Sequence, residues 1–557
     1  MLEKINKMSR QIVVILFILM TLAGLAVTPD YGMPWDELME IRTLGSSMRE
    51  YIGLFAGEEN EPPKSTTGIV LTDILENPDT DHGQSVYYPL APVLFTDLGT
   101  GGARTLMLIF HAYTFLIFMT GVVFLYFILK FLTRNWKYGL LASLFLYLSP
   151  RFFAEGHYNS KDIITMSLII ITLWFAIKFI ETKKFRYAAA FAAAGAVAAN
   201  MRIVGLFFFG LMGLIYIICL STQKQWTRQN VASGVIAVLV FAAVYMLITP
   251  AAWASPWDFI QYVFARSSNY SDWPGYVFYL GKSHRPVPWH YVPVMFAVTT
   301  PILIVLLSIT GNITTIGQII RTKAKDLFSG SLKYYFAAAV FTWIFVGYAM
   351  IKQPILYDSW RHFYFLYGLL LILAVGGLKA VMDKLKGKVK WAAAGLVGLQ
   401  LCACMATIGM NHPYEFVYFN LLAGSHPAER YEMDYWNVSQ ANCLMKLIDK
   451  TDPQKVIYLY AADWCSADGL EKAYNILPAN YKDRMKVLPI SYNGIPKKAD
   501  YLMISLRAVQ VSEYGATPES ASWIYTAGLG EFAQKYPVAY AAKAFGSEFM
   551  TIYEITK

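Results

Sequence analysis

Residues 105–129 read TLMLIFHAYTFLIFMTGVVFLYFIL, a run that contains no Asp, Glu, Lys or Arg. A helix needs about 20 predominantly apolar residues to cross a bilayer, so this run predicts a membrane-spanning helix. Ten further apolar stretches predict spans, of which 137–149 and 187–199 are short. The eleven predicted spans are 11–28, 105–129, 137–149, 162–180, 187–199, 203–220, 231–250, 292–310, 333–351, 362–378 and 390–410.

Composition agrees with a polytopic α-helical membrane protein. The chain has 557 residues, of which 56% are hydrophobic and only 15% are charged, whereas soluble proteins carry roughly 25% charged residues. The formal net charge of +9 does not indicate a nucleic-acid partner, because the polar surface that would present a basic face is missing. Five cysteines are too few for a disulfide scaffold.

The distribution of charge predicts the orientation. With a cytoplasmic N-terminus and alternating spans, the cytoplasmic segments hold 21 basic and 4 acidic residues, and the outer loops hold 12 and 18. Lys and Arg accumulate on the cytoplasmic side of membrane proteins. We therefore expect a multi-pass protein of the plasma membrane, with its N-terminus in the cytoplasm and its C-terminus outside. The first span is interpreted as a retained anchor, because no small-x-small cleavage site follows it.

Two domains are expected, a transmembrane domain over residues 1–410 and an extracytoplasmic α/β domain over 411–557. The second contains alternating runs at 456–460, 501–505 and 549–555, which predict strands, and helical patterns at 436–450 and 466–475. Both Cys443 and Cys465 fall in it, which leaves open a disulfide outside the cytoplasm.

The first outer loop, residues 29–104, contains an amphipathic pattern over 37–55. This pattern predicts a helix that lies on the outer membrane surface, packs against the bundle, or does both. The acidic, turn-rich stretch 57–84 predicts a mobile loop.

Asp36 and Glu37 follow the first span closely. An acidic residue in a loop is usually a solvated surface group. Here Pro34, Trp35 and the predicted amphipathic helix hold the pair near the membrane surface, which makes it a candidate for catalysis.

Residues 149–162, SPRFFAEGHYNSKD, bring two acids, a histidine and two cations together before the fourth span. Helical spacing would place His157 and Lys161 on one face. The alternative is helix capping and anchoring at the interface, with the Lys161 side chain extended toward water.

Residues 357–364, YDSWRHFY, place Arg361 and His362 at the outer end of the tenth span. Helix N-termini and arginine side chains both favour phosphate, whereas the alternative is an ion pair between Asp358 and Arg361. Arg202 is a further lone cation on the same side. The connector 284–291, HRPVPWHY, is typical of an aromatic belt.

The sequence contains no Walker loop, HExxH motif, paired CxxC motif or GxSxG elbow. It therefore predicts neither a soluble nucleotide site nor a metal site, and no cofactor.

The ordered set of motifs resembles the GT-C superfamily of polyprenyl-phosphate-dependent glycosyltransferases, in the branch of the protein O-mannosyltransferases and the lipid A aminoarabinose transferases. The segments that carry the resemblance are Asp36-Glu37, Lys161-Asp162, Trp289-His-Tyr291 with Thr299-Thr-Pro301, Tyr357-Asp-Ser-Trp-Arg361-His362, and 412–420 with 432–436.

The resemblance implies inverting transfer of one sugar from a polyprenyl phosphate to an extracytoplasmic protein, lipid or envelope glycan, with no cofactor or metal required. Asp36 would be the general base and Glu37 would orient the loop or the acceptor. Lys161, Arg361, His362 and Arg202 are the candidates for neutralising the phosphate. The expected substrate-binding or supporting residues are His157, Asp162, Tyr357, Asp358 and Tyr291.

The alternative from another class is a polytopic transporter or a flippase for lipid-linked sugars. Such proteins often show internal repeats and broken helices near the middle of the bilayer. No convincing repeat is found here, and charged residues are nearly absent from the middle of the predicted spans. An enzyme is therefore favoured over a transporter.

Overall fold

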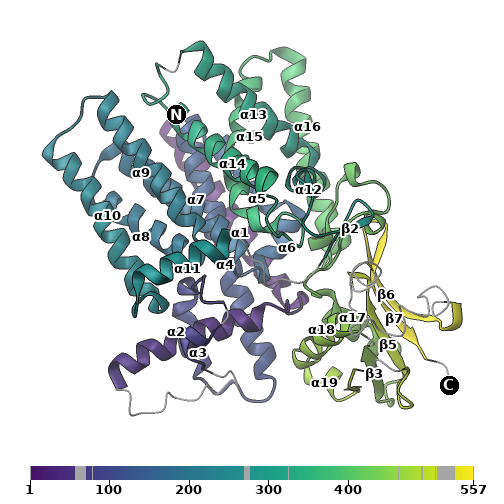
Figure 1. Ribbon diagram of the computed structural model, residues 1–557. Coiled ribbons are helices and arrows are strands. Elements are labelled where there is room, and N and C mark those ends of the chain that lie inside the picture. Colours follow the sequence, from purple (N-terminus) through teal and green to yellow (C-terminus); the bar gives the residue numbers. More distant parts are fainter. Residues whose placement is uncertain are drawn as a thin grey trace.

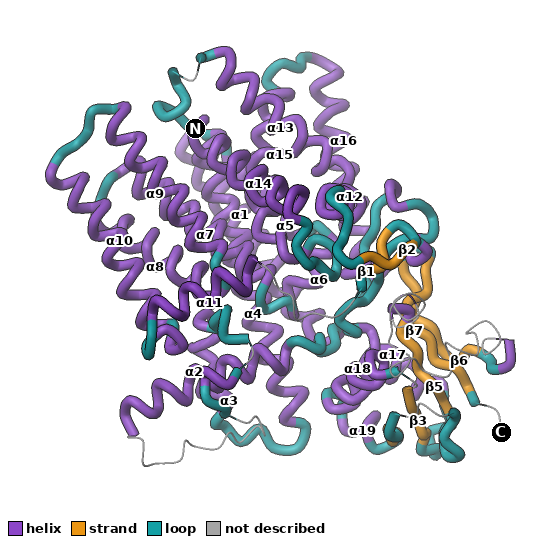
Figure 2. The backbone as a smooth tube through the Cα atoms, in the orientation of Figure 1, coloured by secondary structure: helices purple, strands orange, loops and turns teal. Residues whose placement is uncertain are grey.

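The structure is a computed structural model that describes residues 2–56, 71–77, 79–268, 276–323, 325–461, 463–490, 494–507, 510 and 534–555. It consists of a bundle of long helices with a smaller sheet-containing part beside one end (Figures 1 and 2). The predicted fold class, a polytopic helical protein with a C-terminal α/β part, is confirmed.

Within these ranges nine helical segments are long and apolar enough to cross a membrane. They are built from α1 (Leu2–Val27), α4 (Gly102–Thr133), α7 (Asp162–Thr182), α9 (Val204–Thr222), α10 (Arg228–Ile248), α13 (Ile302–Arg321), α14 (Leu332–Lys352), η5 (Arg361–Leu366) continued by α15 (Tyr367–Met382), and α16 (Gly387–Asn411).

The two short predicted spans form helices that do not reach this length. They are α5 (Trp136–Tyr147) and α8 (Phe185–Met201). At 1.5 Å rise per residue, α5 is about 18 Å long, well below the roughly 30 Å of the hydrocarbon core. It is followed by α6 (Pro150–Tyr158), and the two together lead the chain from the end of α4 to the start of α7.

The predicted span 292–310 is wrong in its bounds. The chain forms a short α12 (Tyr291–Thr299), breaks, and continues as α13. The break falls at Thr300-Pro301, because proline disfavours helical backbone in the residue before it, and Thr300 is extended with φ −111° and ψ 143°. The amide of Asn420 donates to the carbonyl oxygens of Ala297 and Thr300, both at 2.6 Å, and so satisfies the broken end.

The loops that the charge pattern assigns to the cytoplasm lie at one end of the bundle. In Figure 1 the N-terminus lies at the upper end, together with the connections between α9 and α10 and between α15 and α16. Helix α2 (Glu37–Ala56), helix α3 (Ala91–Leu94) and the C-terminal sheet lie toward the opposite end. This segregation agrees with the predicted alternation of the spans.

The predicted amphipathic helix 37–55 is present as α2. Ile41 and Leu44 in its first half are fully buried, whereas Leu54 and Phe55 near its end are exposed, Phe55 by 90%. The first half therefore packs on the protein, and the apolar side chains at the end are free to contact lipid.

The C-terminal part contains a five-stranded sheet in the order β4-β3-β5-β7-β6. The strands β3, β4 and β5 are parallel, whereas β5, β7 and β6 pair in antiparallel fashion. The bounds are β3 (Ile457–Ala461), β4 (Met485–Val487), β5 (Tyr501–Ser505), β6 (Val538–Ala544) and β7 (Ser547–Glu554), with helices α17 (Ser439–Lys450), α18 (Trp464–Asn475) and α19 (Ala479–Lys482).

The sequence pattern thus predicts β3, β5, β7, α17 and α18 to within three residues at each end. It misses β4, which is short, and β6, whose alanines give a weak pattern. Cys443 is a free, buried cysteine, so the disulfide considered for it is not formed. The side chain of Cys465 lies outside the described residues.

The connector 284–291, predicted as an aromatic belt, follows an antiparallel hairpin of β1 (Val277–Tyr279) and β2 (Lys282–His284). A backbone bridge joins Tyr279 to Tyr431 in the segment after α16. The hairpin therefore ties the helical bundle to the C-terminal part.

One continuous apolar core includes buried residues of the bundle, such as Phe118 and Tyr364, together with Trp436 and Phe549 of the C-terminal part. The segment after α16 has only short 3₁₀ turns, η6 (Glu415–Val417), η7 (Leu421–Ala423) and η8 (Pro427–Glu429). Its side chains pack between the bundle and the sheet, so the two parts share one core.

Candidate functional site

A cavity of about 260 Å³ lies beside the start of α2 and the starts of α7, α9 and η5. One part of its wall is polar and charged, and comprises Asp36, Asp79, Asp81, His82, Lys161, Arg202, Arg266, Ser267 and His362. The other part is apolar and aromatic, and comprises Ile203, Val204, Phe345, Tyr348, Pro354, Ile355, Leu356, Tyr357, Phe363 and Phe365. Such a divided wall suits a ligand with a charged head and an apolar tail.

Asp36 lies immediately before α2, where its carbonyl oxygen accepts hydrogen bonds from the backbone N–H groups of Met39 and Glu40. Its side chain is 31% exposed and faces the cavity. It is therefore an accessible carboxylate on a residue whose backbone begins the first turn of a helix.

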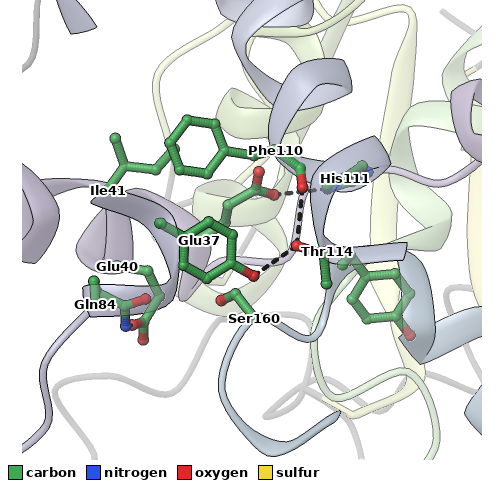
Figure 3. Close-up of a pocket in the computed structure, with 10 residues that line it drawn as sticks. Glu37, Glu40, Ile41, Gln84, Phe110, His111, Thr114 and Ser160 are labelled. Atoms are coloured by element: carbon green, nitrogen blue, oxygen red, sulfur yellow. Dashed lines mark hydrogen bonds and ion pairs between the residues drawn. The ribbon is translucent and has the colours of Figure 1, made fainter. Parts of the chain in front are cut away.

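Glu37 points away from the cavity, although it is the next residue. Its carboxylate is buried, with Oε2 2.9 Å from Nε2 of His111 on α4 (Figure 3). The two adjacent acids therefore lie in different surroundings. Asp36 lines the cavity, whereas Glu37 contacts His111 and so connects α2 to α4.

Lys161, directly before α7, forms an ion pair with Glu40 on α2. Burial by itself lowers the pKa of Lys161, but Glu40 and Asp36 outweigh it and raise that pKa above the ordinary value. Burial likewise raises the pKa of Glu40, but Lys161 and His82 lower it to about 2. Lys161 therefore reaches the cavity as a charged group.

Asp162 lies between two arginines. Its Oδ1 is 2.6 Å from Nη2 of Arg202, and its Oδ2 is 3.3 Å from Nη1 of Arg361. Since Arg202 follows α8 and Arg361 begins η5, this one buried carboxylate joins three segments and holds the two guanidinium groups close together.

Arg361 is only 2% exposed and lies among three carboxylates. Its nitrogens are 3.3 Å from Asp162, 3.4 Å from Asp358 and 3.7 Å from Asp36. Its guanidinium carbon also lies 4.4 Å from the ring centroid of Trp436, with the rings of Tyr357 and Tyr435 at 4.7 and 5.3 Å.

These contacts surround Arg361, and it is not among the residues that line the cavity. The resemblance implies that Arg361 neutralises the phosphate directly. In the structure Arg361 instead contacts Asp36 and Asp162, and Asp36 is the one of the three that lines the cavity. Of the residues predicted to neutralise the phosphate, the cations that line the cavity are Lys161 and Arg202. The imidazole of His362 lines the cavity as well. The Nδ1 atom of His362 is buried and has no hydrogen-bond partner among the described residues.

His157 does not reach the cavity. Its ring is stacked between Tyr31 and Phe115, at centroid distances of 4.5 and 4.3 Å, and its Nε2 is 3.1 Å from the carbonyl oxygen of Gly24. The prediction that His157 and Lys161 share a helix face is wrong, because α6 ends at Tyr158 before Lys161.

Tyr291 is also not among the residues that line the cavity. It is buried and packs edge-to-face on Tyr279 at 4.9 Å. Of the remaining predicted residues, Tyr357 lines the cavity, while Asp358 contacts Arg361 without lining it.

The loop 79–84 supplies site residues that the sequence pattern does not identify. His82 lies between two acids, with Nδ1 3.4 Å from Asp81 and Nε2 3.8 Å from Glu40, and Asp81 also accepts from Nε of Arg266 at 3.1 Å. Burial lowers the pKa of His82, but Asp81 and Glu40 outweigh it and raise that pKa to about 9. The prediction of a mobile loop over 57–84 is therefore wrong for 79–84, and residues 57–70 and 78 lie outside the described residues.

A close approach of backbone holds this loop in place. The N–H of Gly83 donates to the carbonyl oxygen of Asn200 at 2.7 Å, and a Cβ atom at Gly83 would lie 2.3 Å from the Asn200 amide. That amide also donates to Ile248 and to Thr249. Only glycine fits here, but a lone glycine in a polar stretch gives no such signal in the sequence.

Two other missed residues have a signal that could have found them. Glu40 lies four positions after Asp36 on the predicted helix, so its side chain returns to the same face. His111 is an ionisable residue inside a long apolar span, a position at which a polar side chain usually serves a function. In the described ranges no group of three or more His, Cys, Asp or Glu side chains is placed to hold a metal ion.

Comparison with known proteins gives a family match to one part of the chain. Residues 94–253 match the family described as dolichyl-phosphate-mannose-protein mannosyltransferase. A search of curated proteins gives no match.

Two solved structures of ArnT from Cupriavidus metallidurans align with nearly the whole chain. The form bound to undecaprenyl phosphate is 13% identical with a TM-score of 0.41, over 97% of this chain and 98% of that one. The apo form is 16% identical with a TM-score of 0.46, over 98% of each chain.

The matched segment contains Lys161, Asp162 and Arg202, three residues that contact or line the candidate site. The family match confirms the resemblance to the GT-C glycosyltransferases, and residues 94–253 of this chain are similar to the dolichyl-phosphate-mannose-protein mannosyltransferases.

Proposed function

We propose that this protein is an inverting glycosyltransferase that moves a single sugar from a polyprenyl phosphate to an acceptor outside the cytoplasm. The observation that carries the proposal is the cavity wall, on which a carboxylate, Asp36, and two cations, Lys161 and Arg202, share a space with apolar side chains. The family match over residues 94–253 supports the same class of reaction.

In the proposed reaction Asp36 acts as the general base. A carboxylate oxygen takes the proton of an acceptor hydroxyl as that hydroxyl oxygen attacks the anomeric carbon. The bond between the anomeric carbon and the phosphate oxygen breaks, and its electron pair leaves with the lipid phosphate. A single displacement of this kind inverts the anomeric configuration.

Lys161 and Arg202 neutralise the charge that grows on the departing phosphate. Fixed cations of this kind are effective because they need no rearrangement when the charge develops. Lys161 is held by Glu40 and Arg202 by Asp162, so both are oriented before the donor binds. The imidazole of His362 supplies a further hydrogen bond to the phosphate or the sugar.

The size and lining of the cavity favour a small sugar. Its volume of about 260 Å³ is slightly below the range of roughly 300–1,000 Å³ that is typical of small-molecule pockets. This space suits one sugar with its phosphate rather than an oligosaccharide. The aromatic and aliphatic wall around Phe345, Phe363 and Phe365 suits the first part of the lipid.

The proposed setting is the plasma membrane, with the N-terminus in the cytoplasm and the cavity and C-terminal part outside. The concentration of basic residues in the loops at one end of the bundle supports this orientation. The proposed partners are a membrane lipid carrier and an acceptor hydroxyl of a protein, a lipid or an envelope glycan. No cofactor is part of the proposal.

The test uses the full chain in detergent with radiolabelled undecaprenyl phosphate mannose and an envelope extract from cells that lack the gene. We expect label to move to the extract with release of undecaprenyl phosphate. Asp36→Asn should lower the rate by roughly 10²–10⁴-fold, the usual contribution of a general base. Asp97→Asn is the matched control, because Asp97 is exposed and outside the cavity wall.

If mannose is not transferred, mass spectrometry of envelope glycans and glycoproteins with and without the gene identifies the sugar as a missing single-residue increment. No missing increment, together with movement of the labelled lipid across vesicles that contain the protein, would favour the flippase alternative. Full transfer by Asp36→Asn would refute the role of Asp36 as base.

A further inference from the structure

A cluster of side chains connects the C-terminal part to the residue before Asp36. Arg507, which follows β5, lies with its guanidinium carbon 4.9 Å from the ring centroid of Trp35 and 4.2 Å from that of Tyr435. The rings of Trp35 and Tyr435 meet edge-to-face at 5.3 Å. The Trp35 side chain therefore packs against two groups, Arg507 and Tyr435, that come from beyond α16 and also contact each other.

Arg507 is itself firmly placed. Its Nε is 2.7 Å from Oε1 of Glu432, and both side chains are almost completely buried. The backbone N–H of Glu432 donates to the carbonyl oxygen of Phe278 in the β1–β2 hairpin. A buried arginine with a paired carboxylate and two aromatic neighbours has little freedom to move.

The main chain at Trp35 is held from the same side. The Nζ of Lys472 on α18 donates to the carbonyl oxygen of Trp35 at 3.1 Å, and it is paired with Asp468 at 2.6 Å. The C-terminal part thus contacts both the ring and the peptide group of the residue that precedes Asp36.

These contacts matter because the chain has no helix or strand between η1 (Thr28–Asp30) and the start of α2. The position of the Asp36 carboxylate therefore depends on what holds the segment 31–36. Displacement of a reacting group by about 1 Å can cost on the order of 10²-fold in rate.

We propose that Arg507 is a positioning residue that fixes Asp36 through Trp35, so that the C-terminal part completes the catalytic geometry. The inference rests on the proposed role of Asp36. It follows that the C-terminal part contributes to the geometry of the catalytic site, in addition to any separate role in binding.

The kinetic test compares Arg507→Ala with wild type in the transfer assay. We expect kcat to fall on the order of 10–100-fold, with little change in the KM for the lipid donor, because the cavity cations Lys161 and Arg202 are held by Glu40 and Asp162. Arg507→Lys keeps the pairing with Glu432 but loses the planar stack, and should recover part of the rate. Lys543→Ala is the matched control, because Lys543 is an exposed cation on the edge strand β6.

A second measurement does not depend on catalysis. Hydrogen–deuterium exchange of the full chain in detergent should show faster exchange in residues 31–38 of Arg507→Ala, with unchanged exchange in β3 and β5. Faster exchange in β3 and β5 as well would mean general loss of the C-terminal fold, and would overturn the specific positioning role.

Unchanged exchange in residues 31–38 would also overturn the inference, whatever the activity. If wild type transfers no sugar from any donor tested, the proposed function fails, while the exchange result still decides whether Arg507 orders this segment. If wild type is active and Arg507→Ala retains full kcat, only the positioning inference fails.

Discussion

Nη2 of Arg361 lies 3.7 Å from Oδ2 of Asp36. This distance permits electrostatic attraction but is longer than a hydrogen bond, so the carboxylate is oriented and still has capacity to accept a proton. Arg361 holds Asp162 as well, and Asp162 in turn holds Arg202. One buried arginine therefore links the proposed base to a proposed phosphate ligand.

Arg361→Lys should act on catalysis more than on donor binding. Lysine keeps the charge but cannot contact Asp36, Asp162 and Asp358 together, because it lacks the planar fork. We expect kcat to fall roughly 10–100-fold, while the donor KM changes by less than about threefold. Steady-state kinetics with varied donor checks this, with the exposed Arg186→Lys as control. A large rise in the donor KM at constant kcat would instead assign Arg361 to the phosphate.

Glu37→Gln should leave most of the activity in place. Glu37 is buried against His111 and does not line the cavity, so an amide of the same shape can keep a hydrogen bond to the imidazole. We expect a rate within about tenfold of wild type, in contrast to the much larger loss that removal of a general base causes at Asp36. Equal losses from Glu37→Gln and Asp36→Asn would contradict the distinction between the two acids.

His82 should stabilise the fold in a pH-dependent way. Its pKa rises from the ordinary 6.5 to about 9 in the folded protein, because Asp81 and Glu40 outweigh the effect of burial. A raised pKa means that the stabilisation is complete below pH 6.5 and is lost as the pH rises through about 9, with an upper size of about 3 kcal/mol.

Thermal unfolding of His82→Gln and wild type in detergent between pH 6 and pH 10 tests this expectation. These pH limits are about half a unit below the ordinary pKa and about one unit above the raised one. The difference in Tm should be largest at the acidic end and should shrink toward the alkaline end. A difference that is independent of pH would show that His82 does not gain its stabilisation from protonation.

Gly83→Ala should disturb the site through a steric clash. The added Cβ would lie 2.3 Å from the Asn200 amide, which is fixed by bonds to Ile248 and Thr249. Breaking such buried hydrogen bonds costs about 1–3 kcal/mol each, so we expect a lower Tm and slower transfer as Asp81 and His82 move. Gly53→Ala on α2 is the control, since nothing lies within 4 Å of its Cβ position. Equal behaviour of the two variants would contradict the account of the loop.

The apolar runs of the sequence determined most of the helical architecture, because burial in lipid requires about 20 apolar residues whatever their neighbours are. Period-two patterns determined β3, β5 and β7 in the same local way. The predictions failed where neighbours decide the outcome: at Thr300-Pro301, where the helix breaks and Asn420 satisfies the broken end, and at β6, which forms because β7 pairs with it.

For the site, the sequence by itself determined that Asp36, Lys161, Arg202 and His362 belong at the same end of the bundle. Lys161, Arg202 and His362 lie directly at the outer end of a predicted span, and Asp36 lies in the outer loop that follows the first span. Only the tertiary structure decided which of them reach one cavity. Adjacent residues on a helix start point in different directions, so Asp36 enters the cavity while Glu37 meets His111. The contributions of His82 and Arg507 come from segments far away in the chain, and long-range packing alone brings them to Glu40 and Trp35.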